Sequence, residues 1–384
     1  MLNKKVLYAL GDVTIMPCVE SKVRHRSECN VFYTDKLTGK KHLPIFTAPM
    51  DMVVSKDNFD IWDNNYIIPI LPRTEQLSYR VEYATNGKWA AFGLDEFENL
   101  FCFSDIAEKK YKNQHIRALI DIANGHIKSL QTAIKLAKTW SKRFNYTIEI
   151  MAGNIANPET YLQLAEAGCD YVRCSIGSGN LCITASNTST YMPMASLLDE
   201  CFEYKKANQL ECKIIADGGI NSYSTAIKAL ALGADYVMMG TTLAKCFESS
   251  GEFIRAERPQ KEFTYLTLQE LNDMRFQVGD EMFKKKIIRD YTPLFKTIYG
   301  MSTRKAQIKI QLASGKTKDE IKTKTSEGIE KEITVDYTVN QWTENFIDYL
   351  RSSMSYCNFT EITDYIGGPE MYLLSESAKN AINK

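Results

Sequence analysis

Short runs of β-branched and aromatic residues alternate with longer segments of helical periodicity, and this alternation constrains the fold more than any other feature. Runs that are apolar on both faces are typical of parallel strands covered by helices. Eight such runs are predicted strands: LPIFTAP (43–49), YIIPIL (66–71), IRALIDIA (116–123), YTIEIMAGN (146–154), DYVRCSIG (170–177), KIIADGG (213–219), DYVMMGTT (235–242) and FKTIYGM (295–301).

Eight strands with helices between most of them favour a (β/α)8 TIM barrel, of class α/β, over an open doubly wound sheet. We expect residues 1–384 to form a single barrel domain. Residues 252–290 are charged and amphipathic and predict an inserted helical or hairpin element. Residues 303–336 are lysine-rich with alternating apolar positions, which predicts a ribbon-like excursion that acts as an active-site flap.

Composition narrows the class of protein. The 47 basic and 47 acidic residues balance and form no long run of one sign, so we expect no nucleic-acid partner. No apolar run has the length of a signal peptide or a membrane span, so we expect a cytoplasmic protein. The ten cysteines include no CxxC pair and only four histidines accompany them, which argues against a zinc or iron–sulfur site. Most of these thiols are predicted to be reduced and buried.

Polar and glycine-rich residues follow the predicted strands, and in a parallel barrel these ends gather on one rim. The loop RCSIGSGNLCIT carries Gly177 and Gly179 just before Cys182, with Thr184 two residues on. This loop is either a surface loop that happens to hold a thiol or a nucleophile beside an anion site. A Gly-x-Gly-x-x-Cys-x-Thr pattern has no need of cysteine for packing, which favours the nucleophile.

The turns ADGGIN (216–221) and MMGTTLA (238–244) lie on consecutive βα units. Paired glycine-bearing turns after late barrel strands are typical of a phosphate site, although each alone is often only a tight turn. In IDIANGH (120–126), Asp121 and Asn124 suit either a site or a helix cap. Glu327, on the predicted flap, is either a site carboxylate or a solvated charge.

Ordered motifs across nearly the whole chain resemble the IMP dehydrogenase and GMP reductase family. The resemblance rests on GDVTIMP, RHRSECN, TAPMD, DIANG, MAGNIANPE, SIGSGNLCIT, IIADGGI, GADYVMMGTTLA, ESSGE, YGMS, SEG and DYLRSSMSY. It implies a (β/α)8 barrel, usually a homotetramer, in which Cys182 attacks C2 of a purine nucleotide to form a thioimidate. A nicotinamide cofactor then exchanges hydride with the same carbon.

The resemblance also implies roles for individual residues. Thr184 and Glu327 would assist proton transfer beside the catalytic Cys182. Substrate-binding positions would be Asn180, Asp217, Gly218, Gly219, Gly240, Thr241, Tyr299, Gly300, Met301 and Ser302. Cofactor-binding positions would be Asp121, Asn124, Gly125 and Asn154, and carbonyls of Gly177 and Gly179 would hold a potassium ion if one binds.

Three features favour an NADPH-dependent GMP reductase, which converts GMP to IMP and ammonia, within this family. Only about forty residues separate ILPR from HIRALID, where dehydrogenases usually carry two CBS modules. Residues 305–336 contain no arginine and no tyrosine, whereas IMP dehydrogenases hydrolyse the thioimidate with a water-activating Arg-Tyr pair on the flap. DIANG resembles the reductase form. A CBS-less IMP dehydrogenase remains an alternative.

The cysteine loop departs from the family pattern. Ser178, Asn180 and Ala185 replace the usual proline, serine and arginine, and Lys324 stands where the reductase places an arginine. These changes keep open a catalytically idle member that only binds purine nucleotides, or a reaction on another purine base.

Overall fold

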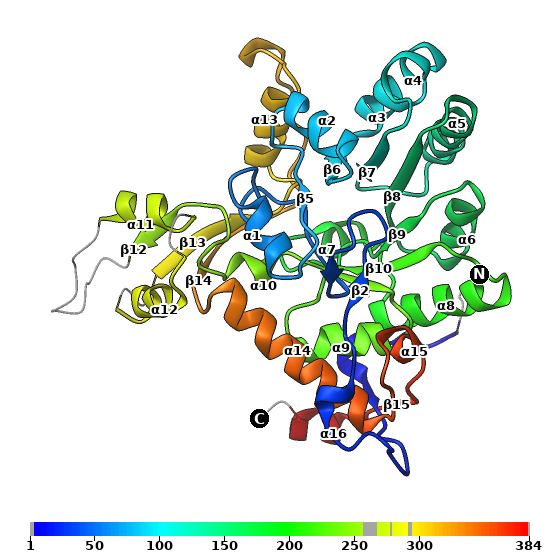
Figure 1. The fold of residues 1–384 in the computed structure, drawn as a ribbon, viewed down its shortest axis with the longest axis vertical. Helices are drawn as coiled ribbons and strands as arrows, with labels where there is room; N and C mark the ends of the chain where they lie inside the picture. Colours follow the sequence, from blue (N-terminus) through cyan, green and yellow to red (C-terminus); the bar gives the residue numbers. More distant parts are fainter. Residues whose placement is uncertain (1–3, 256–266, 277–278, 291–293, 383–384) are drawn as a thin grey trace.

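The computed structural model describes residues 4–255, 267–276, 279–290 and 294–382. Its centre is an eight-stranded parallel sheet (Figure 1). The strand order is β4 (Ile45–Thr47), β11 (Tyr236–Met239), β10 (Lys213–Asp217), β9 (Tyr171–Cys174), β8 (Thr147–Ile155), β7 (His115–Asp121), β6 (Trp89–Phe92) and β5 (Ile70–Leu71).

The sheet closes on itself next to β5. Thr47 N–H donates to Ile68 O at 3.0 Å, and Ile68 N–H donates to Ile45 O at 2.9 Å. These bonds join β4 to the residues that lead into β5, so the eight strands form the predicted barrel.

Helices alternate with the strands and cover the barrel (Figure 1). Asn157 caps α6 by accepting from Glu159 N–H, with Pro158 in the first turn, as NPE predicted. The helices between strands are α1 (Phe59–Asn64), α2 (Leu77–Thr85), α3 (Leu94–Phe101), α4 (Ser104–Lys110), α5 (Lys128–Phe144), α6 (Pro158–Glu166), α7 (Thr184–Thr188), α8 (Met194–Ala207) and α9 (Tyr223–Ala231), and α10 (Thr241–Ala244) and α14 (Val339–Tyr356) follow β11.

One of the eight predicted strands was wrong as a barrel strand, and another barrel strand was missed. FKTIYGM forms β13 (Leu294–Tyr299), which pairs antiparallel with β12 (Phe253–Arg255) and β14 (Glu330–Thr334) in a separate sheet. The eighth barrel strand is β6, whose residues WAAF carry little β-branched signal. The segment between ILPR and HIRALID therefore contains α2, β6, α3 and α4.

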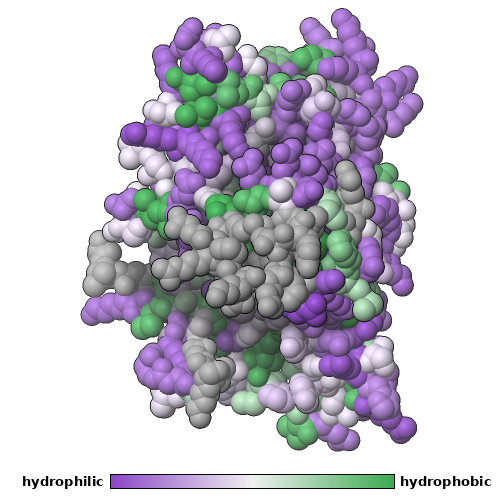
Figure 2. Space-filling model, turned by 90° about the vertical axis from the view of Figure 1, so that its left-hand side faces the viewer, coloured by the Kyte–Doolittle hydropathy of each residue, from purple (hydrophilic) through white to green (hydrophobic). Residues whose placement is uncertain are grey.

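The three-stranded sheet projects from one side of the barrel together with α11 (Leu268–Met274) and α12 (Glu281–Asp290) (Figure 1). Phe247, Phe253, Leu271 and Leu294 belong to the separate apolar cluster beneath it. The expected insertion at 252–290 includes β12, α11 and α12, while its residues 256–266 and 277–278 lie outside the described residues. On this side, hydrophobic patches are scattered among hydrophilic residues (Figure 2).

The ribbon expected at 303–336 is only partly present. Residues 304–313 form helix α13 (Arg304–Ala313), because Thr303 caps its first turn by accepting from Ala306 N–H. A short 3-10 turn, Lys318–Glu320, follows, and the strand β14 then completes the excursion. The strand predicted from the alternating apolar positions 308, 310 and 312 was therefore wrong, because these residues lie in α13.

The chain ends pack together on the barrel. β1 (Val13–Ile15) pairs antiparallel with β15 (Met371–Leu373), near α15 (Ile362–Tyr365) and α16 (Glu376–Ile382). A hairpin of β2 (Tyr33–Thr34) and β3 (Lys41–His42) precedes β4. None of the helices in the described ranges is long and apolar enough to cross a membrane.

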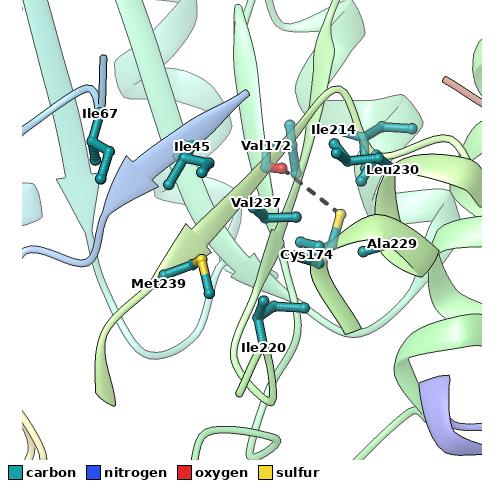
Figure 3. Packing of buried hydrophobic residues seen from close by; sticks show 14 of the residues in the cluster. Ile45, Ile67, Val172, Cys174, Ile214, Ile220, Ala229, Leu230, Val237 and Met239 are labelled. Carbon is teal, nitrogen blue, oxygen red and sulfur yellow. Dashed lines mark hydrogen bonds between the residues drawn. The ribbon is translucent and has the colours of Figure 1, made fainter. Parts of the chain in front are cut away.

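The cysteines are largely structural, as expected. Eight are buried, and only Cys18 and Cys182 are partly accessible. Figure 3 shows Cys174 among Val172, Ile214 and Leu230, with its thiol donating to Val172 O at 3.8 Å. Burial raises the pKa of the Cys102 thiol to about 12, so such thiols stay protonated near neutral pH.

Candidate active site

The loop after β9 brings together the three residues that the resemblance made catalytic. Cys182 Sγ lies 3.2 Å from Thr184 Oγ1, and Thr184 Oγ1 donates to Glu327 Oε2 at 2.6 Å. The three side chains form one hydrogen-bonded chain, in which Thr184 and Glu327 are 143 residues apart in sequence. A thiol, a hydroxyl and a carboxylate in series provide a nucleophile and a route for a proton.

Main-chain pairing explains why Glu327 reaches this loop. Ile183 N–H donates to Glu327 O at 2.9 Å, and Ile329 N–H donates to Leu181 O at 3.0 Å. The Cys182 loop and the segment around Gly328 therefore meet as a short antiparallel bridge.

Glycine is required where YGMS passes behind this bridge. A Cβ on Gly300 would lie 2.7 Å from Leu181 O, so the close approach excludes a side chain. The partly buried Ser302 lies beside Gly328, with Ser302 Oγ 3.0 Å from the position of a Cβ on that glycine. Met301 is also partly buried, so YGMS lines the base of the cysteine loop.

A buried arginine joins the predicted ribose and cofactor positions. Arg173, 7% exposed, donates from Nη1 to Asp121 Oδ1 at 2.6 Å and from Nε to Asp217 Oδ2 at 2.9 Å. Asn154 Nδ2 also donates to Asp217 Oδ2 at 2.6 Å. Burial acts to lower the pKa of Arg173, but the two carboxylates outweigh it and raise that pKa. The network fixes three strand ends, those of β7, β8 and β10, in one arrangement.

The DGG turn packs directly on the cysteine loop. A Cβ on Gly218 would lie 2.8 Å from Ser178 Oγ and 3.1 Å from Gly179 N. Gly218 and Gly219 both have positive φ angles, of 104° and 72°, which favour glycine. Ser178 Oγ also hydrogen-bonds Ser175 Oγ, so the loop that lacks the family proline is held by side-chain contacts.

The turn at Gly240 lies next to β4. A Cβ on Gly240 would lie 2.8 Å from Met50 Sδ, so the residue permits close packing on the TAPMD segment. Thr241 begins α10 and is partly buried, whereas the side chain of Asn180 is exposed at its loop tip. The two glycine turns and the cysteine loop therefore lie on one rim of the barrel.

Tyr299 makes a polar cluster that sequence reasoning did not foresee. Its hydroxyl donates to Asp51 Oδ2 at 2.5 Å, and Lys309 Nζ donates to the same oxygen and to Tyr299 Oη, each at 2.7 Å. Burial and the Asp51 carboxylate raise the pKa of Tyr299 well above its ordinary value, so it remains a neutral donor.

The cofactor positions form a second cluster beside Arg173. Gly125 N–H donates to Asn154 O at 2.8 Å, and a Cβ on Gly125 would lie 2.7 Å from that oxygen. Asn124 is exposed, and its Oδ1 accepts from His126 N–H at 3.0 Å. Asp121 O accepts from Arg73 Nη1 at 3.1 Å.

Buried polar atoms without partners gather at this rim. Asp51 Oδ1, Arg73 Nε and Thr74 Oγ1 are buried and have no hydrogen-bond partner among the residues that the structure describes. These residues follow β4 and β5, on the same rim as Asp121. Buried polar atoms normally have a hydrogen-bond partner. These three atoms therefore fit a polar ligand that binds over this end of the barrel.

One residue that was not foreseen carried a signal in the sequence. Arg173 is a charged residue inside the apolar run DYVRCSIG, and such a charge is stable in a strand only when it is paired. Asp51, in contrast, was expected on this rim among the polar residues that follow the predicted strands. Lys309 and Arg73 carried no comparable signal, because each depends on a tertiary contact.

The predicted potassium site is only partly defined by geometry. Gly177 has a positive φ of 75°, and a Cβ there would lie 2.8 Å from Ala185 N, so the loop folds tightly on α7. Gly179 O accepts from Cys182 N–H at 2.9 Å, which leaves one lone pair of that carbonyl for another partner.

A shallow cavity of about 490 Å³ lies elsewhere, lined by residues such as His115 and Thr147 at the start of β7 and β8. It is at the opposite end of those strands from Asp121 and Asn154. The chemistry-bearing residues thus lie at the carboxyl ends of the strands, where barrel enzymes carry their sites.

Known proteins are similar in sequence to this chain. Residues 107–290 match the IMP dehydrogenase / GMP reductase domain. The chain is 29% identical over 324 residues to a GMP reductase of Clostridium acetobutylicum, which covers 81% of this chain and 92% of that protein. It is 28% identical over 267 residues to GMP reductase 2 of Bos taurus, covering 66% of this chain and 73% of the relative.

Inosine-5'-monophosphate dehydrogenases match over shorter parts of their length. One from Chlorobaculum tepidum is 28% identical over 249 residues, which is 64% of this chain and 42% of that protein. One from Helicobacter pylori is 30% identical over 206 residues and is matched over 40% of its length. The chain therefore spans less than half of these dehydrogenases.

Proposed function

The chain belongs to the IMP dehydrogenase/GMP reductase family, whose members are oxidoreductases, and we propose that it is a GMP reductase that uses NADPH. The observation that carries the proposal is the hydrogen-bonded chain from Cys182 through Thr184 to Glu327. A carboxylate and hydroxyl behind the nucleophile suit the release of ammonia, which must leave with an added proton.

The first half-reaction makes a bond to the enzyme. Cys182 Sγ forms a bond to C2 of GMP, the bond from C2 to the amino nitrogen breaks, and ammonia leaves. Glu327 and Thr184 pass a proton toward that nitrogen, because Thr184 Oγ1 lies between the carboxylate and Sγ. The product is a thioimidate on Cys182.

The second half-reaction releases IMP. NADPH, when bound, supplies a hydride for C2, after which the bond from C2 to Sγ breaks and Cys182 leaves as a thiolate. Asp121, Asn154 and Gly125 would hold the nicotinamide end, and Arg173 keeps Asp121 in place. Arg73, whose Nη1 donates to Asp121 O, also has a buried Nε without a partner among the described residues, and this supports a polar ligand there.

Substrate recognition follows from the remaining rim residues. Asp217 would bind ribose hydroxyls, while Gly218, Gly219, Gly240 and Tyr299 would hold the phosphate. The partly buried positions of Met301 and Ser302 support contact with the base edge. Potassium at Gly177 and Gly179 and a homotetramer stay predictions from the resemblance, and a cytoplasmic location stays a prediction from the lack of a long apolar run.

An IMP dehydrogenase is the second candidate, because several relatives carry that name. Two cuvettes followed at 340 nm separate the two activities. GMP with NADPH is expected to give a fall in absorbance and an equal amount of ammonia. A rise with IMP, NAD and potassium, without a GMP-dependent fall, would replace the reductase by the dehydrogenase. No change in either would favour a member that only binds nucleotides.

A further inference from the structure

Two glutamines of α13 hold the segment that leads to Glu327. Gln311 Nε2 donates to Lys322 O at 2.9 Å, and Gln311 Oε1 accepts from Lys322 N–H at 3.2 Å. Gln307 Oε1 accepts from Lys324 N–H at 2.7 Å, and Gln307 Nε2 lies 3.4 Å from Lys324 O. Each side-chain amide therefore pairs with both main-chain groups of one residue in the arm, which we define as residues 321–326.

The spacing of the two elements makes this pairing regular. Residues four apart on one face of a helix have Cβ atoms about 5–6 Å apart. Residues two apart in an extended chain lie about 6.6 Å apart. Gln307 and Gln311 thus meet Lys324 and Lys322 in register, antiparallel to the helix, as a partner strand would.

The helix that carries these glutamines is itself fixed to the barrel. Ser314 Oγ donates to Glu96 Oε1 at 2.6 Å, and Glu96 is paired at 2.8 Å with the fully buried Arg80. At the other end, Gln307 Nε2 donates to Ser302 O at 2.8 Å, in the YGMS segment. Movement of α13 is therefore restrained from both the rim and the site.

The arm makes its contacts with α13 through main-chain atoms. The side chains of Lys322 and Lys324 are exposed. Among the described residues, the main-chain N–H and C=O groups of these two lysines bond only to the side-chain amides of Gln307 and Gln311. Three residues after Lys324, Glu327 reaches Thr184. The two glutamines thus hold the arm that leads into Glu327, while the main-chain bonds of Glu327 and Ile329 to the cysteine loop hold the residues that follow it.

We propose that Gln307 and Gln311 are positioning residues, which hold the arm so that Glu327 meets Thr184 and Cys182. The inference rests on the proposed function only in the role that it gives to Glu327. An error of about 1 Å in the position of a catalytic group is enough to cost roughly 100-fold in rate. The contacts of Gln307 and Gln311 with the arm therefore affect the reaction directly.

The first test measures amide hydrogen exchange at residues 322 and 324 in the full chain without ligands. The variant Gln307→Met with Gln311→Met keeps the length of both side chains and removes all their hydrogen bonds. Exchange at these two amides is expected to become about tenfold faster, the change for one lost hydrogen bond. The control is Gln131→Met, which removes a surface amide pair with Gln163 on the far helices.

The second test measures the rate at which iodoacetamide alkylates Cys182, from pH 5 to 8, by peptide mass spectrometry. Glu327→Gln and the double glutamine variant are each expected to change this rate, and its pH profile, in the same direction by about fivefold. Because the glutamines act through Glu327, adding them to Glu327→Gln is expected to give no further change. Alkylation of Cys18, the other accessible thiol, serves as the internal control.

The outcomes separate the two proposals. Unchanged amide exchange at residues 322 and 324 in the double glutamine variant would show that the two glutamines do not hold the arm. If the effects of the glutamine substitutions and of Glu327→Gln on the alkylation rate of Cys182 multiply, the glutamines do not act through Glu327. Neither measurement uses GMP or NADPH. A wild-type enzyme that leaves GMP unchanged would therefore contradict the reductase while these results still decide the role of the glutamines.

Discussion

At the scale of single residues, the site is organised by charges that the barrel cannot leave unpaired. Arg173 lies within β9 and is accommodated only because Asp121 and Asp217 flank it at 2.6 and 2.9 Å. The same ion pairs fix two carboxylates that would otherwise repel each other at the mouth of the barrel. One buried guanidinium thus sets the geometry of both the predicted ribose position and the predicted cofactor position.

Replacing Arg173 by methionine is predicted to cost about 3–5 kcal/mol of unfolding free energy, because it leaves two carboxylates without their partner. Urea denaturation at pH 7 measures the loss. Arg117→Met is a useful comparison, since Arg117 also bridges two carboxylates, Asp35 and Glu149, at the opposite end of the barrel. Only Arg173→Met is expected also to weaken nucleotide binding. If Arg173→Met lowers the unfolding free energy by less than about 1 kcal/mol, the ion pairs of Arg173 with Asp121 and Asp217 do not stabilise the fold as we predict.

At the scale of elements, sequence patterns predicted most of the barrel and failed for definable reasons. The strands that became β7, β8, β9, β10 and β11 are apolar on both faces, so their pattern was clear. β6 was missed because two of its four residues are alanine. A turn signal, Gly93 with Glu96 three residues later, marks its end and could have located it.

β13 was misplaced for the opposite reason. Its apolar residues suggested a barrel strand, yet Phe295 and Thr297 are only partly buried, which is the alternation of an antiparallel sheet. α13 was read as a strand because Ile308, Ile310 and Leu312 alternate. The capping residue Thr303 and the glutamines at helical spacing were the better indication.

The contact between α13 and the rim gives a prediction on pH. Although burial opposes it, hydrogen bonds from Arg80 and Ser314 lower the pKa of Glu96 to about 2. In the unfolded chain this pKa is near 4.5, so the unfolded state binds the proton first as the pH falls. The stabilisation is therefore complete above pH 4.5 and is lost between about pH 4.5 and 2.

Glu96→Gln is predicted to cost about 3–5 kcal/mol at pH 7, because it leaves the buried Arg80 charge uncompensated. The difference from wild type should narrow as the pH falls from 4.5 toward 2. Urea denaturation at pH 7 and pH 3 measures both effects, with the exposed Asp95→Asn as the control on the same helix. A difference that stays constant across this pH range would contradict the role of Glu96.

At the scale of the whole molecule, the barrel explains why residues far apart in sequence share one site. Parallel strands end on the same rim, so polar residues after the strands were predictable as neighbours. Glu327 was not predictable in this way, because the bridge to Leu181 and Ile183 forms outside the barrel. Its role came from the resemblance, and the bond to Thr184 shows that the fold brings it there.

The contacts that hold α13 and the arm were beyond sequence reasoning. They depend on main-chain groups at 322 and 324, which carry no residue-specific signal. The Tyr299 cluster likewise joins Asp51 to Lys309 across 258 residues. Such contacts follow only from the packed structure.

The central claim is that Cys182 bonds to C2 of a purine nucleotide while Thr184 and Glu327 release ammonia. The most direct measurement is intact-protein and peptide mass spectrometry after incubation with GMP and NADP⁺, which cannot donate hydride. We predict a covalent nucleotide adduct on Cys182 and one equivalent of ammonia, with neither in Cys182→Ser and much slower formation in Glu327→Gln. Bound GMP without an adduct or ammonia would contradict the account.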